Sequence, residues 1–265
     1  MDSGMILHMV LGLLLLAVPA GVLYYYDKRM LRYFMVAVVR MFVQLLVLCL
    51  MVMVLIRYDS VWLSLLWVFL LTLLSAFVAW SRSKVPTLFY NSIFLGILIG
   101  SLLTGGYLLG AVFPVKEWLE PRWFVPVIAL LMGHTTTSVI RGLSAYYSSL
   151  HADEQHYEFM RGNGHSHLQA VTPFVRRSLQ AMLSPSVNNL YRMGLYTMPL
   201  LLCGILLGGM TPINAFVLTL MLTIGCLAAS VIALGITLWL ADVVLFDRFG
   251  KLIHPSDKEN KEKKQ

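Results

Sequence analysis

Hydrophobic runs of about twenty residues recur along this chain and are separated by short polar stretches. A helix of about twenty apolar residues is long enough to cross the hydrocarbon core of a bilayer. A backbone exposed to lipid must satisfy its own hydrogen bonds, so each run predicts a membrane-spanning helix. The pattern therefore predicts an all-α, polytopic membrane protein with about seven transmembrane helices. They are expected at residues 5–25, 33–56, 60–80, 87–113, 123–148, 187–208 and 213–241.

The positive charges are divided unevenly between the two sets of loops, and basic residues near spans favour the cytoplasmic side. One set holds only Arg57, Lys116 and Arg122. The N-terminus is therefore expected outside and the C-terminus in the cytoplasm. The last residues, 251–265, are charged and lack apolar periodicity, which predicts a disordered basic tail after a single transmembrane domain over 1–250. The other set of loops carries that tail and Lys28, Arg29, Arg32, Arg82, Lys84, Arg161, Arg176 and Arg177.

Composition supports the membrane class. Hydrophobic residues make up 58% of the chain and charged residues 12%, with a mean hydropathy of +0.77. Soluble domains carry about 25% charged residues. The net charge of +7 comes from Lys and Arg beside apolar runs, so it predicts contact with membrane lipids and no nucleic-acid partner. The three cysteines, Cys49, Cys203 and Cys226, lie in apolar runs and are expected to be reduced.

A long polar stretch, residues 150–186, interrupts the pattern between the fifth and sixth runs. Residues 151–161 predict a polar helix that projects into the cytoplasm, and Gly162-Asn163-Gly164 predicts a turn after it. From Pro173 onward the apolar residues fall on one face of a helix, with arginines on the other. This part is expected to lie at the membrane surface as an amphipathic helix, a cytoplasmic coupling segment.

The spacing of four residues in this segment resembles the cytoplasmic loop signature of ABC importer permeases. Gly164 follows Glu158 by six positions, Ala170 follows Gly164 by six, and Pro173 comes three later. The resemblance implies that a short helix at the turn docks into a cleft on a separate ATPase subunit. The residues assigned to ATPase coupling on this ground are Glu158, Gly162, Gly164, His165, His167, Ala170 and Pro173.

Four further stretches, in order, resemble the FetB-like family of iron-export ABC transporter permeases, small seven-span proteins that include plant aluminium-tolerance permeases. Together the likeness covers about residues 20–250. Two stretches depart from the family: residues 200–205 replace its Gly-Met-Met-Thr-Gly-Gln, and His134 replaces an asparagine. The stretches are "VVRMFVQLL" (38–46), "LLMGHTTTS" (130–138), "TPFVRRSLQAMLSPSVNNL" (172–190) and "MPLLLCGILLGGMTPINA" (198–215).

The family resemblance implies the permease subunit of a two-component ABC transporter, which works as a homodimer in the bacterial cytoplasmic (inner) membrane. It would move a metal ion, with iron export implied by the likeness, or a small solute. The chain has no Gly-x-x-x-x-Gly-Lys-[Ser/Thr] loop, so ATP is expected on a partner ATPase subunit. This chain is then expected to bind no cofactor or metal of its own and not to be an enzyme.

Polar residues at membrane depth are candidates for a transport path, because each is costly in hydrocarbon. Arg40 and Gln44 share one face of the second span. Asp242 is predicted to pair with Arg40 or Arg192, unless each arginine reaches the headgroups alone. The full set assigned to the path is Arg40, Gln44, His134, Thr135, Cys203, Arg192 and Asp242.

Two histidine-bearing positions leave alternatives open. His134 is either a buried neutral histidine that donates to a carbonyl or a residue that lines the path, and the hydroxyls that follow it can bond to the preceding turn. His165-Ser166-His167 is either a metal site or, with more weight, a contact with the ATPase. Pro199 is expected to kink the sixth span, and a gate or kink is assigned to Pro199, Gly204, Gly209 and Pro212.

The alternative function is a membrane-embedded enzyme that acts at the cytoplasmic face. Such an enzyme needs clustered acids or a metal triad near the surface. The chain has 13 Asp and Glu residues, nearly all in predicted loops or the tail, and no His-Glu-x-x-His spacing. ATP-independent turnover of a lipid or peptide would favour this alternative.

Overall fold

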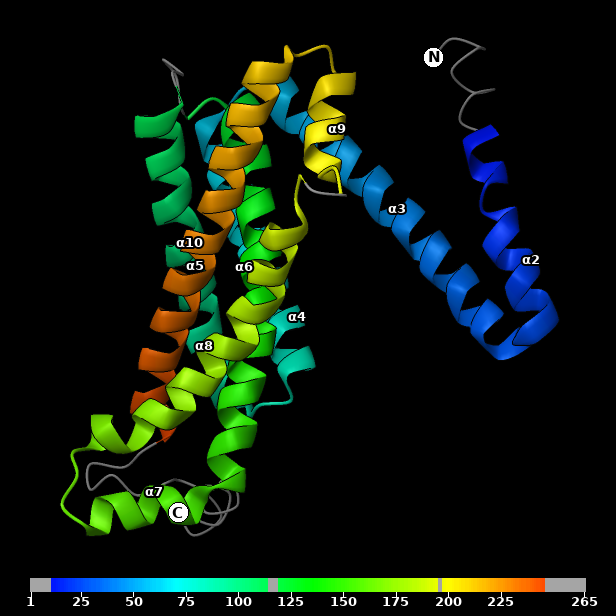
Figure 1. The fold of residues 1–265 in the computed structure, drawn as a ribbon. Helices are drawn as coiled ribbons and strands as arrows, with labels where there is room; N and C mark the ends of the chain where they lie inside the picture. Colours follow the sequence, from blue (N-terminus) through cyan, green and yellow to red (C-terminus); the bar gives the residue numbers. More distant parts are fainter. Residues whose placement is uncertain (1–10, 114–118, 195–196, 246–265) are drawn as a thin grey trace, which may run out of the picture. The chain divides into compact units, whose positions relative to one another are not determined.

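The computed structural model describes residues 11–113, 119–194 and 197–245, and within these ranges the regular structure is helical (Figure 1). The chain divides into two compact units, Met1–Tyr58 and Asp59–Gln265. The helices are α2 (Ala17–Tyr26), α3 (Lys28–Tyr58), α4 (Val61–Ser83), η1 (Thr87–Phe89), α5 (Tyr90–Tyr107), η2 (Leu108–Val112), α6 (Pro121–Ala152), α7 (Glu154–Gly162), α8 (His167–Arg192), α9 (Leu200–Leu207) and α10 (Pro212–Leu245).

The first unit is a hairpin of α2 and α3, which pack against each other. The chain reverses at Asp27, whose carboxylate accepts hydrogen bonds from the backbone N–H groups of Arg29 and Met30 at 2.9 and 3.0 Å. An acidic residue at this position satisfies amides that have no partner within the helix. Asp27 therefore fixes where α3 begins.

The second unit is a bundle of α4, α5, α6, α8 and α10, and α6 packs against each of the other four. Figure 1 shows α7 lying across one end of this bundle and α9 beside the first turns of α10. The core is apolar, and hydroxyl side chains within it bond to carbonyls one turn back, as Thr72 does to Val68 at 2.8 Å. These bonds pair most of the buried hydroxyls, although the buried Oγ1 of Thr104 has no hydrogen-bond partner among the described residues.

Helices α5 and α10 approach each other closely, because glycines of α5 face small residues of α10. A Cβ placed on Gly100 would lie 2.8 Å from the Cβ of Ala233 and 2.9 Å from its backbone nitrogen. It would also lie 3.0 Å from the carbonyl oxygen of Ala229. Both alanines are fully buried. Small residues permit such backbone contact, which is a frequent basis of helix association in membranes.

Five helical segments are long and apolar enough to cross a membrane, which confirms an all-α polytopic chain. Each corresponds to one predicted run, namely the second, third, fourth, fifth and seventh. The first run, 5–25, is described only from residue 11, where Leu11–Tyr26 forms a shorter apolar helix. The number of crossings and the orientation stay predictions, and so does the single domain over 1–250. The tail 251–265 lies outside the described residues. The five segments are Lys28–Tyr58, Val61–Ser83, Thr87–Val112, Pro121–Ala152 and Pro212–Leu245.

The predicted continuous sixth span, 187–208, is wrong. Helix α8 runs through position 187 and ends at Arg192, and α9 begins only at Leu200. Between them Gly194 has φ +83°, and the Thr197 side chain donates to the Arg192 carbonyl at 3.0 Å. A glycine in the left-handed region ends a helix readily. The apolar run is therefore split between the end of α8 and the eight residues of α9.

The boundaries predicted for the amphipathic helix also need correction. Helix α8 begins at His167, six residues before Pro173, and its apolar face packs on α6 rather than on a lipid surface. Phe174 and Met182 are buried there, and the Ser178 hydroxyl donates to the Gly142 carbonyl at 2.7 Å. The arginines of the polar face are exposed, as predicted for that face. Helix α8 is thus a member of the bundle.

Candidate functional site: the α7–α8 turn and its contacts

The α7–α8 turn, defined here as Gly162 to Ser166, ends α7 with a double hydrogen-bonded cap. The His165 N–H donates to the Met160 carbonyl at 3.2 Å, and the Gly164 N–H donates to the Arg161 carbonyl at 3.1 Å. Gly164 has φ +83°, a conformation that side chains disfavour. This is the Schellman arrangement. The turn predicted at Gly162-Asn163-Gly164 is confirmed. Gly164 is the position in it that requires a glycine.

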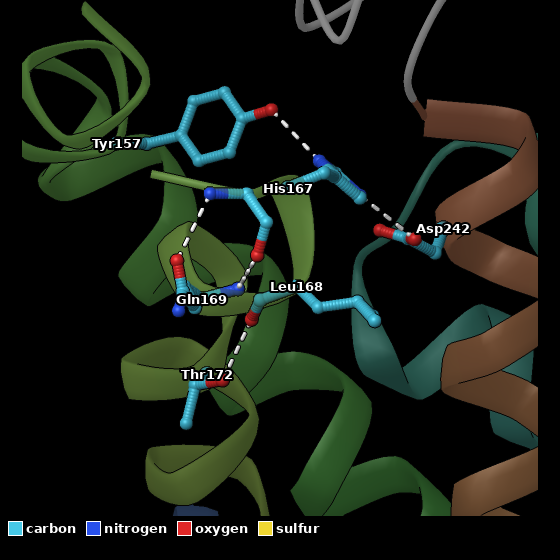
Figure 2. A network of polar contacts seen from close by, with 7 residues as sticks. Tyr157, His167, Leu168, Gln169, Thr172 and Asp242 are labelled. Carbon is cyan, nitrogen blue, oxygen red and sulfur yellow. Dashed lines mark hydrogen bonds and ion pairs between the residues drawn. The ribbon is translucent and has the colours of Figure 1, made fainter. Parts of the chain in front are cut away.

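A capping box begins α8 on the other side of the turn (Figure 2). The Ser166 hydroxyl accepts from the Gln169 backbone N–H at 3.4 Å, and the Gln169 side chain accepts from the Ser166 backbone N–H at 3.0 Å. Two amides that a helix start leaves unpaired are satisfied in this way. Ser166 is therefore an N-cap, and the turn is held rigidly at both ends.

The His167 imidazole joins three helices. Its Nε2 lies 2.8 Å from Oδ2 of Asp242 on α10, and its Nδ1 lies 3.0 Å from the hydroxyl of Tyr157 on α7 (Figure 2). The side chains of His167 and Asp242 are 27% and 26% exposed, so water only partly screens their interaction. Tyr157 is buried. Positions 157, 167 and 242, far apart in sequence, meet here.

The Asp242 carboxylate, which can only accept, and the Tyr157 hydroxyl together fix which nitrogen of a neutral His167 carries the proton. Burial raises the pKa of Tyr157 above its ordinary value; the charge of Arg161 lowers it in part, and the Asp242 carboxylate raises it further. Tyr157 is therefore protonated near neutral pH and can donate to Nδ1. The other nitrogen, Nε2, then carries the proton and donates to Asp242. When His167 is protonated, it adds a charge opposite to that of the carboxylate.

A second ion pair fastens α8 to the turn between α6 and α7. The Arg177 guanidinium donates to the Asp153 carboxylate at 2.5 Å, and both side chains are about half exposed. Exposed pairs of this kind contribute little to stability. This pair touches α8 and the start of α7 without involving α10, which makes it a useful control for the His167 contact.

Around the α7–α8 turn the surface combines backbone, charge and two large apolar side chains. All residues from Gly162 to Ser166 are exposed, and so is Glu158. Phe159 is 66% exposed and Leu168 is 76% exposed, one on each side of the turn. Among the predicted coupling residues, Ala170 is fully buried and Pro173 is half-buried, so these two support α8 rather than face outward.

Several contributors to this site were missed by the sequence reasoning. The Ser-x-x-Gln spacing at Ser166 and Gln169 is a readable helix-start signal that could have predicted the beginning of α8. Phe159 and Leu168 carry no local signal, because exposure of an apolar residue depends on what packs beside it. Tyr157 is on the buried side of a short polar helix and could not be assigned to His167 from spacing alone.

At membrane depth, His134 on α6 contacts Ser230 on α10, with Nδ1 3.2 Å from the serine oxygen. The Ser230 hydroxyl donates its only proton to the Cys226 carbonyl at 2.7 Å. It must therefore accept from His134, which places a proton on Nδ1 and leaves Nε2 of the neutral ring as an acceptor. The partner predicted for His134, a carbonyl, is therefore the Ser230 hydroxyl instead, and His134 is exposed within this unit.

The hydroxyls that follow His134 behave as predicted. Thr136 and Thr137 donate to the carbonyls of Met132 and Gly133 at 2.6 and 3.0 Å. Thr135 donates to the Met132 carbonyl and lies 3.3 Å from the Ser101 hydroxyl on α5. Because Thr135 is fully buried, it packs α5 against α6, while His134 beside it faces out of the unit.

Within the second unit, Asp242 pairs with a residue other than Arg192, while the predicted pairing with Arg40, which lies in the first unit, stays a prediction. The partner of Asp242 is His167. Arg192 is the last residue of α8 and is exposed, not two turns inside a span. Arg40 and Gln44 lie on α3 in the first unit, exposed on one face of that helix. The prediction for Arg192 failed because α8 begins early enough to bring the His167 imidazole to the carboxylate.

The residues assigned to a kink or gate lie around α9. Pro199 does not kink a continuous span; it stands directly before α9 as its N-cap. Gly209, with φ +89°, follows α9, and Pro212 is the first residue of α10. A Cβ on Gly204 would meet nothing within 4 Å, so this glycine makes no close helix contact here, and Cys203 on the same helix is half-buried. A role in gating stays a prediction.

A metal site was the weaker interpretation of His165-Ser166-His167. Across residues 11–113, 119–194 and 197–245, no three His, Cys, Asp or Glu side chains gather as a set that could hold a metal ion. His165 instead lies 3.2 Å from the Met160 carbonyl through Nδ1, and His167 contacts Tyr157 and Asp242. In these contacts both histidines organise the turn.

Comparison with known proteins gives a family. Residues 6–246 match the uncharacterised protein family UPF0014, which is nearly the whole chain. The chain belongs to the UPF0014 family. Membership confirms the resemblance drawn from the ordered motifs, because the relatives of this UPF0014 protein include a FetB permease.

Three relatives illustrate how similar in sequence this chain is to known proteins. The UPF0014 membrane protein slr1647 of Synechocystis is 26% identical over 67% of this chain and 69% of its own. The UPF0014 membrane protein STAR2 of rice is 25% identical over 66% of this chain and 60% of its own. The probable iron export permease protein FetB of Escherichia coli is 23% identical over 84% of this chain and 86% of its own. No solved structure matches this UPF0014 chain.

Proposed function

We propose that this UPF0014 protein is the permease subunit of a two-component ABC transporter. The observation that carries the proposal is the α7–α8 turn, an exposed and doubly capped projection between helices of a polytopic bundle. A rigid projection can transmit force to or from a partner, whereas a loose loop cannot. The relative named as a probable iron export permease supports the same class of function.

The proposed partner is an ABC-type ATPase that binds ATP, because the chain has no phosphate-binding loop of its own. Phe159 and Leu168 would enter an apolar cleft on that subunit, and Glu158 would face its rim. Partly apolar projections with a polar rim are suited to reversible docking. Two permease chains, related by two-fold symmetry, would then face two ATPase subunits in the bacterial cytoplasmic membrane, with lipids around them.

The proposed cargo is a metal ion, with iron export as the leading case, or a small solute. His134 supports it: this residue is exposed in the second unit, and Nε2 of its neutral ring is left as an acceptor. Imidazole nitrogen is a ligand for borderline metals such as iron. A polar group exposed at membrane depth is costly in lipid and therefore favours a path over a lipid contact.

The test of the function is reconstitution of the chain in proteoliposomes with the ABC-type ATPase that co-purifies with it, identified by its P-loop peptide. ATP-dependent movement of radioactive Fe²⁺ or Co²⁺ across the vesicle membrane is the expected result. Equal movement with and without ATP would contradict it. Turnover of lipid or peptide by the chain alone, without ATP, would support the alternative of a membrane-embedded enzyme.

Replacing His134 by alanine should lower metal-stimulated ATP hydrolysis of the same pair about tenfold, because one ligand to the cargo is lost. Ser230→Ala should lower it less, since the ring remains and only its preferred tautomer is released. Basal hydrolysis without metal serves as the control for an intact pair. Equal stimulation of His134→Ala and the unaltered chain would remove His134 from the path.

A further inference from the structure

The carboxylate of Asp242 sits near the end of α10 and, among the described residues, has one hydrogen-bond partner. Its Oδ2 accepts from His167, while its buried Oδ1 has no hydrogen-bond partner among the described residues. A carboxylate that is half in contact with protein and half unpaired relies heavily on its one partner. Loss of His167 would remove the one ion-pair partner that this carboxylate has in the part of the chain that the structure describes, so the two residues act as one unit.

Elsewhere α8 and α10 touch little, in contrast to the long packing of each helix on α6. The imidazole of His167 is therefore the principal polar link between the α7–α8 turn and α10. Because Tyr157 bonds to the same ring, α7 is joined to α10 through it as well (Figure 2). A movement of the turn can reach α10 through this ring without first displacing α6.

Helix α10 continues from this contact into the membrane region. It is unbroken from Pro212 to Leu245, and Ser230 lies twelve residues before Asp242, about 18 Å along the axis. Ser230 is the residue that holds His134 in one tautomer. One helix thus carries the contact with the α7–α8 turn at one end and the contact with the polar group of α6 near its middle.

We propose that His167 and Asp242 form the joint through which the α7–α8 turn moves α10, and with it the Ser230–His134 contact. His167 and Asp242 are positioning residues in this proposal, since neither is required to touch the cargo. The proposal rests on the proposed function only for the source of the movement, an ATPase that docks on the turn. The joint itself is a property of the single chain.

Hydrogen exchange of the full-length chain in nanodiscs, followed by mass spectrometry, tests the joint without an ATPase. Asp242→Ala and His167→Ala should each speed exchange in the first turn of α8 and the last turns of α10 about tenfold. Asp242→Asn and His167→Gln keep a hydrogen bond and should give a smaller change, which guards against a variant that fails to fold. Arg177→Ala, which breaks the other ion pair of α8, should leave the hydrogen exchange of α10 unchanged.

The transmission is tested by a double-mutant cycle. Gly164→Ala strains the turn and should alter exchange in the last turns of α10, and this response should vanish in the His167→Ala background. A response that persists without His167, or an Arg177→Ala chain that changes α10 as much as Asp242→Ala does, would overturn the proposal. A chain that shows the response but binds no ATPase would contradict the proposed function and still support the joint formed by His167 and Asp242.

Discussion

A Gly164→Pro chain should bind the ATPase subunit with an affinity at least about tenfold lower, while its membrane bundle stays folded. Proline fixes φ near −65° and has no N–H, whereas Gly164 has φ +83° and donates to the Arg161 carbonyl. The substitution therefore destroys the cap that presents Phe159 and Leu168. Pull-down of the ATPase by tagged chain, quantified over a range of ATPase concentrations, measures the effect.

Gly162→Ala is the matched control for this result. Gly162 is the last residue of α7, and a Cβ on it would meet nothing within 4 Å, so alanine should bind the ATPase as the unaltered chain does. Glu158→Lys reverses a charge beside the turn without changing the backbone and should weaken binding in a salt-dependent way. If the ATPase is retained by both Gly164→Pro and Glu158→Lys, the docking site lies elsewhere.

Gly100→Ala should lower the stability of the bundle by about 1–3 kcal/mol, because the added methyl meets the backbone of α10 and forces the two helices apart. Besides the Ala233 Cβ at 2.8 Å, the nearest atoms are the Ala233 nitrogen at 2.9 Å and the Ala229 carbonyl oxygen at 3.0 Å, and neither of these backbone atoms can rotate away. A fall in Tm of the detergent-solubilised chain is the expected measurement. A larger side chain, as in Gly100→Val, should lower Tm further.

The same substitution at Gly106, on the same helix, supplies the control. A Cβ there meets nothing within 4 Å, so Gly106→Ala should leave Tm unchanged or raise it. The rise would come from the gain in helix propensity, which adds about 0.5–1 kcal/mol to the stability. An equal Tm for Gly100→Ala and Gly106→Ala would show that α5 and α10 do not pack as closely as described. Comparing these two variants separates the effect of helix–helix contact from that of helix propensity, because the substitution is the same and only the neighbouring atoms differ.

Long apolar helices could be predicted from the sequence because lipid allows few alternatives. In runs such as 60–80 and 213–241 the side chains are apolar on every face, and only a helix satisfies the backbone there. The predicted turn at Gly162-Asn163-Gly164 was of the same local kind, since φ above zero needs a glycine. The ordered motifs were enough to predict the family that the comparison then confirmed.

The wrongly predicted sixth span shows which helix boundaries could not be predicted from local sequence patterns. Pro173 suggested the start of the amphipathic helix, yet both Pro173 and Pro185 lie inside α8, whose burial on α6 outweighs the cost of each proline. The helix continues past position 187 for the same reason, and it ends only where Gly194 leaves the helical region. Packing against a neighbour is not visible in a hydropathy pattern.

The sequence by itself determined that this chain is helical, polytopic and interrupted by a polar turn, because each property follows from residues within a turn or two of one another. Only the tertiary structure decided that Asp242 meets His167, that Ser230 sets the tautomer of His134 and that Thr135 is a packing residue. These partners are separated by 34 to 96 positions along the chain. Their contacts depend on how whole helices cross, which the small residues of α5 and α10 help to set.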